Sequence, residues 1–517
     1  MPDSSATTPE QKPRKASKSF TREVKSGMAW TVIGRGGVQF FNLLSSVVLA
    51  RLLSPSDFGV LGLSVLFTGV SGRASNLSFG MAIVQRDTIR PDHLATLFAT
   101  MLAVNGAVFV SLVSMSPWVG EYFGNPLIGH VLAVSSLNFL IRCIGVCPSA
   151  MLRRSMSFKV LSTGTILDAF FNLLLAMSLA LLGFGVWSLV WAGLTAGLLS
   201  KLYLVKASGW RPSLRASRAA FKELFGFGMG VSISELITYA ADRTGNFVIG
   251  KTMGTTALGY YDKAHSLMSL PARELGTRVN RVLFPVFARI HRESSRFRAA
   301  MRKTVLSLSL VGYPVFGSLI VLAPEVVAVM YGDQWTGAVL PFQILCLMSL
   351  PKLMVDVMVA AIFATGSASH EVKRRMGIAA LVVVGSLVGA RWGIAGVATA
   401  LVIANVCGLI TVLWRLRHLK LLEPFTDVVR PQRIPFVGGL ALIGAERACQ
   451  VWTQGLGIGA FGVLAVSLIV GSAVYLVVVA VLKDKLLSRL LIELKGDVVP
   501  IVARMPMSVA LMRRLRS

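Results

Sequence analysis

Charged side chains are scarce in this sequence, and acidic ones are scarcer than basic ones. They make up 15% of its 517 residues, with 24 Asp and Glu against 52 Lys and Arg. A soluble domain carries about 25% charged residues. The shortage argues against a chain whose main solvent is water.

Several motifs of catalysis and metal binding are also missing. The sequence contains no Walker A pattern, no His-Glu-x-x-His and no Asp-x-Asp, so it has neither a built-in ATPase of that type nor a sign of metal chemistry. Its five cysteines lie in apolar segments without paired metal-site spacing, and we expect free thiols that act as small hydrophobic groups. We expect no cofactor and no metal. The basic residues 1–25 lack an apolar core, so we also expect no cleavable signal peptide.

Long apolar segments are abundant, and most reach the length of about 20 residues that spans a membrane. We mark fourteen: 26–50, 58–84, 93–116, 127–150, 160–181, 186–205, 226–250, 257–288, 304–323, 337–363, 377–390, 394–414, 436–451 and 458–482. The weakest are 377–390, which is short, and 436–451, which contains Glu446 and Arg447. A count of twelve that drops the last pair leaves the orientation of the others unchanged.

Basic residues follow every second connection between these segments. Of the 52 Lys and Arg, 38 lie in the two tails and the even-numbered connections and 11 lie inside segments, leaving only Arg51, Lys251 and Arg391 on the odd-numbered connections. Cytoplasmic loops retain such charges, so we expect both termini in the cytoplasm. This placement explains the net charge of +28 by topology and by attraction to anionic membrane lipids. It argues against nucleic-acid binding.

An internal repeat is readable at an offset of about 200 residues. The stretch 51–61 (RLLSPSDFGVL) aligns with 251–261 (KTMGTTALGYY), and Arg73 then aligns with Arg273. Further along, Pro117-x6-Gly124-x4-Gly129 resembles Pro324-x7-Gly332-x4-Gly337. An even number of spans per repeat relates the halves by an axis along the membrane normal, as in alternating-access transporters.

The sequence therefore predicts an all-α polytopic membrane protein of about 14 transmembrane helices, with two pseudo-symmetric six-helix lobes and a C-terminal helix pair. The expected divisions are a basic cytoplasmic N-tail 1–25, an N-lobe 26–205, a cytoplasmic linker 206–225, a C-lobe 226–420, appended helices 421–482 and a basic cytoplasmic C-tail 483–517.

Ionisable residues inside a membrane are costly and usually face protein or water. Arginine at depth suits a phosphate-bearing ligand, because its planar guanidinium matches phosphate oxygens bidentately. The candidates for a diphosphate site are Arg73, Arg273, Arg35, Arg142 and Arg243. The alternative for each of them is an ion pair with an acid of a neighbouring helix.

One segment carries a polar stripe at helical spacing, which indicates a face toward water or a buried interface. The stripe contains Arg273 together with Asp262, Ser266, Ser269, Thr277 and Asn280. Three further acids could couple transport to a cation: Asp168, Glu235 and Asp242. Lys352 and Asp356 are spaced i,i+4 and are expected to pair with each other.

Three stretches resemble a known family. Ala50-Arg-Leu-Leu-Ser-Pro-Ser-Asp-Phe-Gly59, Ala257-Leu-Gly-Tyr-Tyr-Asp-Lys-Ala264 and Pro324-Glu-x5-Tyr331-Gly-x2-Trp335 are similar to bacterial polysaccharide flippases of the multidrug/oligosaccharidyl-lipid/polysaccharide exporter (MOP) superfamily. The resemblance implies a bacterial inner-membrane flippase for undecaprenyl-diphosphate-linked oligosaccharide, active in lipopolysaccharide or exopolysaccharide synthesis, with a cationic central cavity. It implies the lipid-linked oligosaccharide as ligand and polysaccharide polymerase or export machinery as partners, and no enzyme activity.

Two other functions fit parts of the pattern. A cation-coupled small-molecule or drug exporter of the same superfamily would depend on the buried acids more than on the arginines. A membrane enzyme of polysaccharide assembly, such as a polymerase, ligase or acyltransferase, would usually need a large outside loop or an acid/base constellation, and neither is present.

Overall fold

The computed structural model describes residues 18–75, 91–218, 221, 229–290, 293–364, 368–482 and 487–488. Most of the C-tail and much of the N-tail lie outside these ranges, as do parts of the linker 206–225 and the end of segment 58–84. Side-chain detail does not extend to Glu235, Thr277 and Asn280, although all three lie on described helices.

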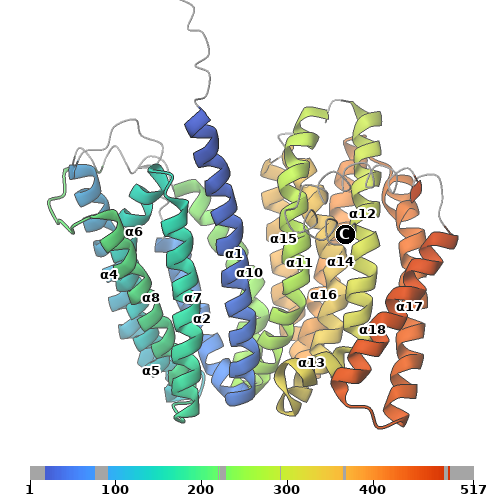
Figure 1. The fold of residues 1–517 in the computed structure, drawn as a ribbon, viewed down its shortest axis with the longest axis horizontal. Helices are drawn as coiled ribbons and strands as arrows, with labels where there is room; N and C mark the ends of the chain where they lie inside the picture. Colours follow the sequence, from blue (N-terminus) through green and yellow to red (C-terminus); the bar gives the residue numbers. More distant parts are fainter. Residues whose placement is uncertain are drawn as a thin grey trace, which may run out of the picture. The chain divides into compact units, whose positions relative to one another are not determined.

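Every predicted apolar segment coincides with helix in the described residues (Figure 1). The helices are α1 (Lys18–Leu52), α2 (Pro55–Ser75), α4 (Pro91–Tyr122), α5 (Pro126–Ser135), α6 (Leu137–Arg154), α7 (Phe158–Leu181), α8 (Val186–Ser208), α10 (Met229–Thr252), α11 (Gly254–Ile290), α12 (Ser294–Val321), α14 (Val339–Ala364), α15 (Ala368–Gly389), α16 (Gly393–His418), α17 (Arg430–Gly455) and α18 (Ala460–Val481). The described residues contain no strand. The chain is an all-helical polytopic membrane protein.

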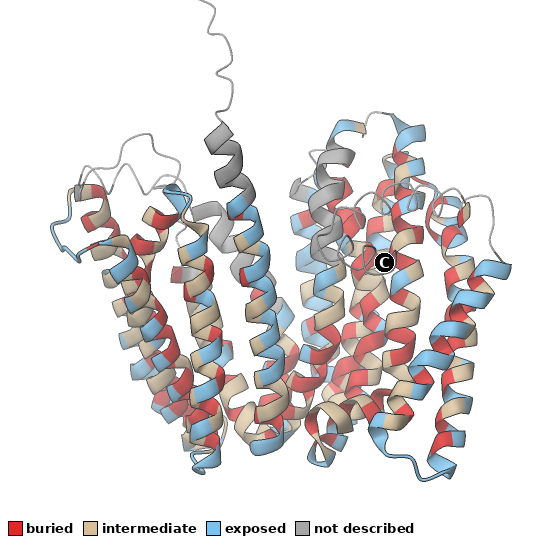
Figure 2. Cartoon of the chain, in the orientation of Figure 1, coloured by how far each residue is buried: buried red, intermediate tan, exposed pale blue. Residues whose placement is uncertain are grey.

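Large apolar side chains lie on the outside of these helices, as expected where lipid is the solvent. On α18, Phe461, Ile469 and Val481 are each at least 70% exposed. Figure 2 shows buried and exposed positions on opposite faces of many helices. In the described part of the chain, nine stretches are long and apolar enough to span a membrane, one of which, His370–His418, contains both α15 and α16.

The helices that fall short of that measure include α10, α11 and α17. These three carry many of the in-membrane charges named from the sequence. Segment 436–451 was weak for the same reason, yet α17 is a helix of 26 residues. It buries Glu446 completely, which explains how a polar residue is accommodated there.

Packing divides the chain into two compact units. Unit 1 comprises Met1–Leu52, Ser71–Pro117 and His130–Ser232, and unit 2 comprises Leu53–Val70, Trp118–Gly129 and Ile233–Ser517. In unit 1, α7 packs against α1 and α8. In unit 2, α14 packs against α11, α12 and α16, and α17 packs against α12 and α18. The lobe boundaries drawn from the sequence stay a prediction.

Two local features add detail that the apolar segments did not indicate. Segment 127–150 lies in one span, Pro126–Arg154, which is divided into α5 and α6 by a one-residue interruption at Ser136, whose hydroxyl donates to Ala133 O at 2.6 Å. The odd-numbered connection 324–336 is itself structured. It folds into α13 (Ala323–Tyr331) and the 3-10 turn η1 (Asp333–Ala338), which bury Tyr331 and Trp335.

The internal repeat is visible as a reciprocal contact within unit 2. A Cβ on Gly59 would overlap Thr255 O, and a Cβ on Gly259 would overlap Pro55 O. These residues are related by the offset of 200, so the starts of the two helices make equivalent contacts with each other, as residues do across a two-fold axis. Ser56 and Thr255 add a hydroxyl–hydroxyl hydrogen bond of 2.8 Å.

The aligned glycines Gly124 and Gly332 of the second repeat stretch both have a positive φ. Gly124 has φ +68° and Gly332 has φ +91°, values that favour glycine because other residues place Cβ too close to the backbone. The matched positions therefore have a physical reason to be glycine in both halves.

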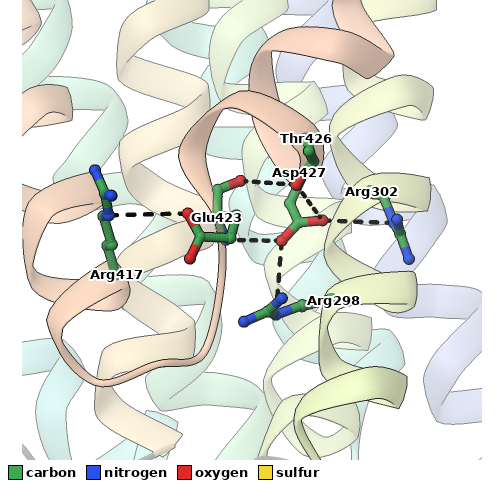
Figure 3. A network of polar contacts seen from close by, with 6 residues as sticks. All are labelled: Arg298, Arg302, Arg417, Glu423, Thr426 and Asp427. Carbon is green, nitrogen blue, oxygen red and sulfur yellow. Dashed lines mark hydrogen bonds and ion pairs between the residues drawn. The ribbon is translucent and has the colours of Figure 1, made fainter.

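The connection between α16 and α17 is held by an ionic network (Figure 3). It contains the five-residue π-helix η3 (Phe425–Val429). The buried Asp427 accepts the Glu423 N–H at 2.8 Å and lies 3.9 Å from Arg298 Nε and 3.6 Å from Arg302 Nε, both on α12. The start of α17 is thereby tied to the beginning of α12.

Candidate functional site

The first group of predicted site residues lies in unit 2, where α10 meets α11. Arg243 Nη1 donates to Asp262 Oδ1 at 3.4 Å, and the Asn246 amide donates to the same oxygen. The Arg243 guanidinium also lies over the Tyr239 ring, 5.7 Å from its centroid. For Arg243 the structure therefore shows the ion pair that was the alternative to a ligand role, with an acid of the predicted stripe as its partner.

The polar stripe of α11 is uneven in exposure. Asp262 is half-buried, Ser266 is exposed, Ser269 is buried and Arg273 is exposed. The Ser269 hydroxyl donates to Ser266 O at 2.9 Å, so it is satisfied inside its own helix. The described part of the stripe therefore presents Ser266 and Arg273 to its surroundings.

Charges of three helices meet around His265, one turn from Asp262. His265 stacks on Tyr261 with 6.2 Å between ring centroids, and the charges of Lys352, Arg243 and Arg273 act on it. Arg243 and Arg273 were named from the sequence. Lys352 was missed as a site residue because its spacing to Asp356 explained it locally.

Acids accompany these cations. The charges of Lys352, Arg375 and Asp242 act on the Asp356 carboxyl group, and that of Lys352 is the strongest of the three. Asp242, a predicted coupling acid, is exposed on α10. This part of unit 2 is a mixed network of cations and acids, in which an anionic ligand would have to compete with carboxylates.

Unit 1 holds the other predicted arginines. Arg142 of α6 lies against α2, since a Cβ on Gly72 would be 3.3 Å from Arg142 Nη1, and Gly72 adjoins Arg73. Arg35 is exposed on α1. Among the described residues, neither Arg142 nor Arg35 has a carboxylate within ion-pair distance. The structure thus places the Arg142 guanidinium against α2, the helix that also carries Arg73, which spacing along the chain could not reveal.

The coupling candidate Asp168 lies half-buried on α7. The cation that acts on it is Lys201 of α8, a helix that packs along α7. The stem of Lys201 lies against Gly145 of α6. Asp168 therefore has a cation of the neighbouring helix in its surroundings, without an ion-pair contact among the described residues.

Sequence reasoning missed a cation–aromatic cluster around Lys263. Its ammonium lies 3.9 Å from the Phe58 ring centroid, 5.0 Å from that of Tyr331 and 5.7 Å from that of Trp335, and Lys263 is buried. All four residues belong to the stretches that carry the family resemblance. Those stretches therefore meet in one cluster of α2, α11, α13 and η1.

The described residues contain no group of three or more His, Cys, Asp or Glu side chains able to hold a metal ion. The five cysteines are free, as predicted, and three of them are buried.

The pairing of Asp262 with Arg243 can be tested directly. We expect Asp262→Ala to lower the free energy of unfolding by about 2 kcal/mol, less than for a fully buried pair because both side chains keep some exposure. Adding Arg243→Gln should recover part of this loss, because the unpaired cation is then gone. The measurement is thermal stability of the purified protein. A double variant less stable than Asp262→Ala alone would contradict the ion-pair role.

Comparison with known proteins places the chain in a family. The family model described as "Polysaccharide biosynthesis protein" matches residues 48–340, more than half of the chain. The teichuronic acid biosynthesis protein TuaB of Bacillus subtilis is 23% identical over 479 residues, which is 89% of this chain and 95% of TuaB. The lipopolysaccharide biosynthesis protein WzxC of Escherichia coli is 25% identical over 64% of this chain and 68% of its own. The succinoglycan biosynthesis transport protein ExoT of Rhizobium meliloti is 29% identical over 65% and 66%.

Two solved structures share the fold. The lipid II flippase MurJ in an inward closed conformation gives a TM-score of 0.70 at 13% identity, covering 88% of this chain and 98% of MurJ. An inward-facing multidrug resistance MATE family transporter of the MOP superfamily gives 0.61 at 16% identity, covering 74% and 95%. The chain belongs to the polysaccharide biosynthesis protein family and is a multi-pass membrane protein.

Proposed function

We propose that this protein is a flippase that moves oligosaccharide repeat units linked to undecaprenyl diphosphate from the inner to the outer leaflet of the bacterial inner membrane, by alternating access. The orientation with both termini in the cytoplasm is part of the proposal, and the distribution of Lys and Arg supports it. The absence of a catalytic step is also part of the proposal.

The observation that carries the proposal is Arg142 in unit 1. Its guanidinium lies against Gly72 of α2, the helix that also carries Arg73, and among the described residues no carboxylate lies within ion-pair distance of Arg142. A guanidinium group can donate two N–H bonds side by side to the oxygens of a diphosphate. Lysine would offer a point charge without that geometry.

Unit 2 supplies a second, mixed region. Arg273 is exposed on α11, and Lys352 and Arg243 act on the same His265. Acids lie among these cations, since Asp356 is within reach of the Lys352 charge and Asp262 pairs with Arg243. We propose that a diphosphate binds Arg273 and Lys352 while Arg243 stays paired with Asp262.

The test is lipid analysis of a deletion strain. We expect diphosphate-linked repeat units to accumulate in the inner leaflet, because synthesis continues while transfer stops. Complementation with the wild-type gene should clear them. A strain that accumulates no such lipid but becomes sensitive to toxic small molecules would support the cation-coupled exporter instead.

A further inference from the structure

A row of polar contacts ties the C-terminal helices to α12 and α13 inside unit 2. The Tyr313 hydroxyl donates to Gln432 Oε1 at 3.1 Å, and the Tyr475 hydroxyl donates to Leu310 O at 2.8 Å. Further along α12, the Ser318 hydroxyl donates to Glu446 Oε1 at 2.6 Å. These side-chain contacts fix which faces of α17 and α18 pack against α12.

Glu446 is the most enclosed acid of this row. Its residue exposure is 0%, and Gly471 of α18 packs directly against its carboxyl group. In the described part of the chain, Ser318 is its sole hydrogen-bond donor, and Glu446 Oε2 has no partner. The buried Ser467, one turn from Gly471 on the same face of α18, also has an unpartnered hydroxyl.

Glu325 of α13 offers an internal comparison. Its Oε1 accepts from Gln450 Nε2 at 2.6 Å and from Gln454 Nε2 at 3.0 Å. Arg447 donates to Gln450 Oε1 at 2.5 Å, so a cation is connected to Glu325 through one amide. In the described residues the second oxygen of each acid has no partner, but Glu325 accepts two amide hydrogen bonds and is linked to a cation, whereas Glu446 accepts only one hydroxyl.

The titratable groups on the surrounding elements do not supply what Glu446 lacks. Tyr313 of α12 and Tyr475 of α18 are committed to the contacts given above, Glu325 of α13 is an acid, and Arg447 on α17 itself is turned toward Gln450. An ionised carboxylate without a counter-charge is costly in a membrane, whereas a neutral carboxyl is not.

We propose that Glu446 is a proton-binding site, and that the neutral acid is the form that docks α17 and α18 onto α12. Loading forms an O–H bond at the carboxyl group with a proton taken from water. Release leaves the carboxylate and returns the proton to water, and requires the helix pair to loosen from α12 so that water reaches Glu446. The site is independent of the molecule that the protein transports.

A hydrophobic carbodiimide tests this in the unmodified protein, since it reacts with protonated carboxyl groups in apolar surroundings. We expect the purified full-length protein to be labelled at Glu446 and not at Glu325 when peptides are analysed by mass spectrometry, with the label lost as pH rises. Glu446→Gln should lose the label and Glu325→Gln should keep it. Infrared spectra should show the same pattern for the protonated carboxyl band.

Three results would overturn the proposal. They are equal labelling of Glu325 and Glu446, no label at Glu446 at any pH, and a label that sodium blocks at constant pH while potassium does not, which would make this a sodium site. Failure of the deletion-strain experiment would leave these outcomes unaffected, so the two ideas fail separately.

Discussion

Polymer export should be lost when Arg273 is replaced by alanine, and should fall more weakly with Arg73→Ala. Each change removes a guanidinium that we assign to the diphosphate, at matched positions of the two halves. We expect at least about a tenfold loss of export for Arg273→Ala, which corresponds to about 1.4 kcal/mol of binding free energy. The measurement is exported polymer per amount of protein in the membrane.

The loss of polymer export should depend on which residue replaces the arginine. Lysine should restore export partly, because it keeps the charge without the planar fork, and glutamate should be worse than alanine because it repels a diphosphate. Arg391→Ala is the matched control, since Arg391 is an exposed arginine of the 3-10 turn η2 (Ala390–Trp392) and is not among the predicted site residues. Full export by the Arg73/Arg273 double alanine variant would refute the cationic site.

Replacing Gly59 or Gly259 by leucine should prevent the protein from accumulating in the membrane. A Cβ at either position would overlap a backbone carbonyl of the facing helix, and a backbone cannot turn aside as a flexible side chain can. We expect a loss of at least about 3 kcal/mol in stability, at the upper end of overpacking effects. Because the contact is reciprocal, both variants should fail to a similar degree.

Gly444→Leu is the control for this pair. Gly444 is exposed on α17 and a Cβ there would meet nothing within 4 Å, so leucine should be tolerated. Protein level in the membrane and thermal stability in detergent provide the comparison. Normal accumulation of Gly59→Leu would mean that the two helix starts do not cross this closely.

The helices could be predicted from the sequence because membrane insertion depends on local properties. Apolar length marks each span, and the positions of Lys and Arg order the connections. The break at Ser136 was missed because hydropathy stays high on both sides of it. The folding of 324–336 was missed because a short buried helix next to Trp335 depends on partners that are distant in sequence.

The site was less predictable, since helical spacing defines a face but not the helix across from it. The stripe of α11 predicted one face for Asp262 and Arg273, yet the pairing of Asp262 with Arg243 needed the packing of α10. Lys352 was not predicted as a site residue because Asp356, four residues further along the helix, explained its charge as part of a local ion pair. Conversely, Lys263 could have been named as a candidate from the sequence, because Lys263 and the aromatic residues Phe58, Tyr331 and Trp335 all belong to the stretches that resemble the family.

The polar contacts of the C-terminal helices α17 and α18 also determine when the buried polar groups of unit 2 gain their partners during biogenesis. Glu325 enters the membrane 125 residues ahead of Gln450, and at about 5–20 residues per second of synthesis this leaves it without that donor for roughly 6–25 s. Arg298 and Arg302 likewise wait for Asp427. The second unit therefore completes its polar pairing only as the last two helices arrive, so the final stage of translation acts as the checkpoint for its assembly.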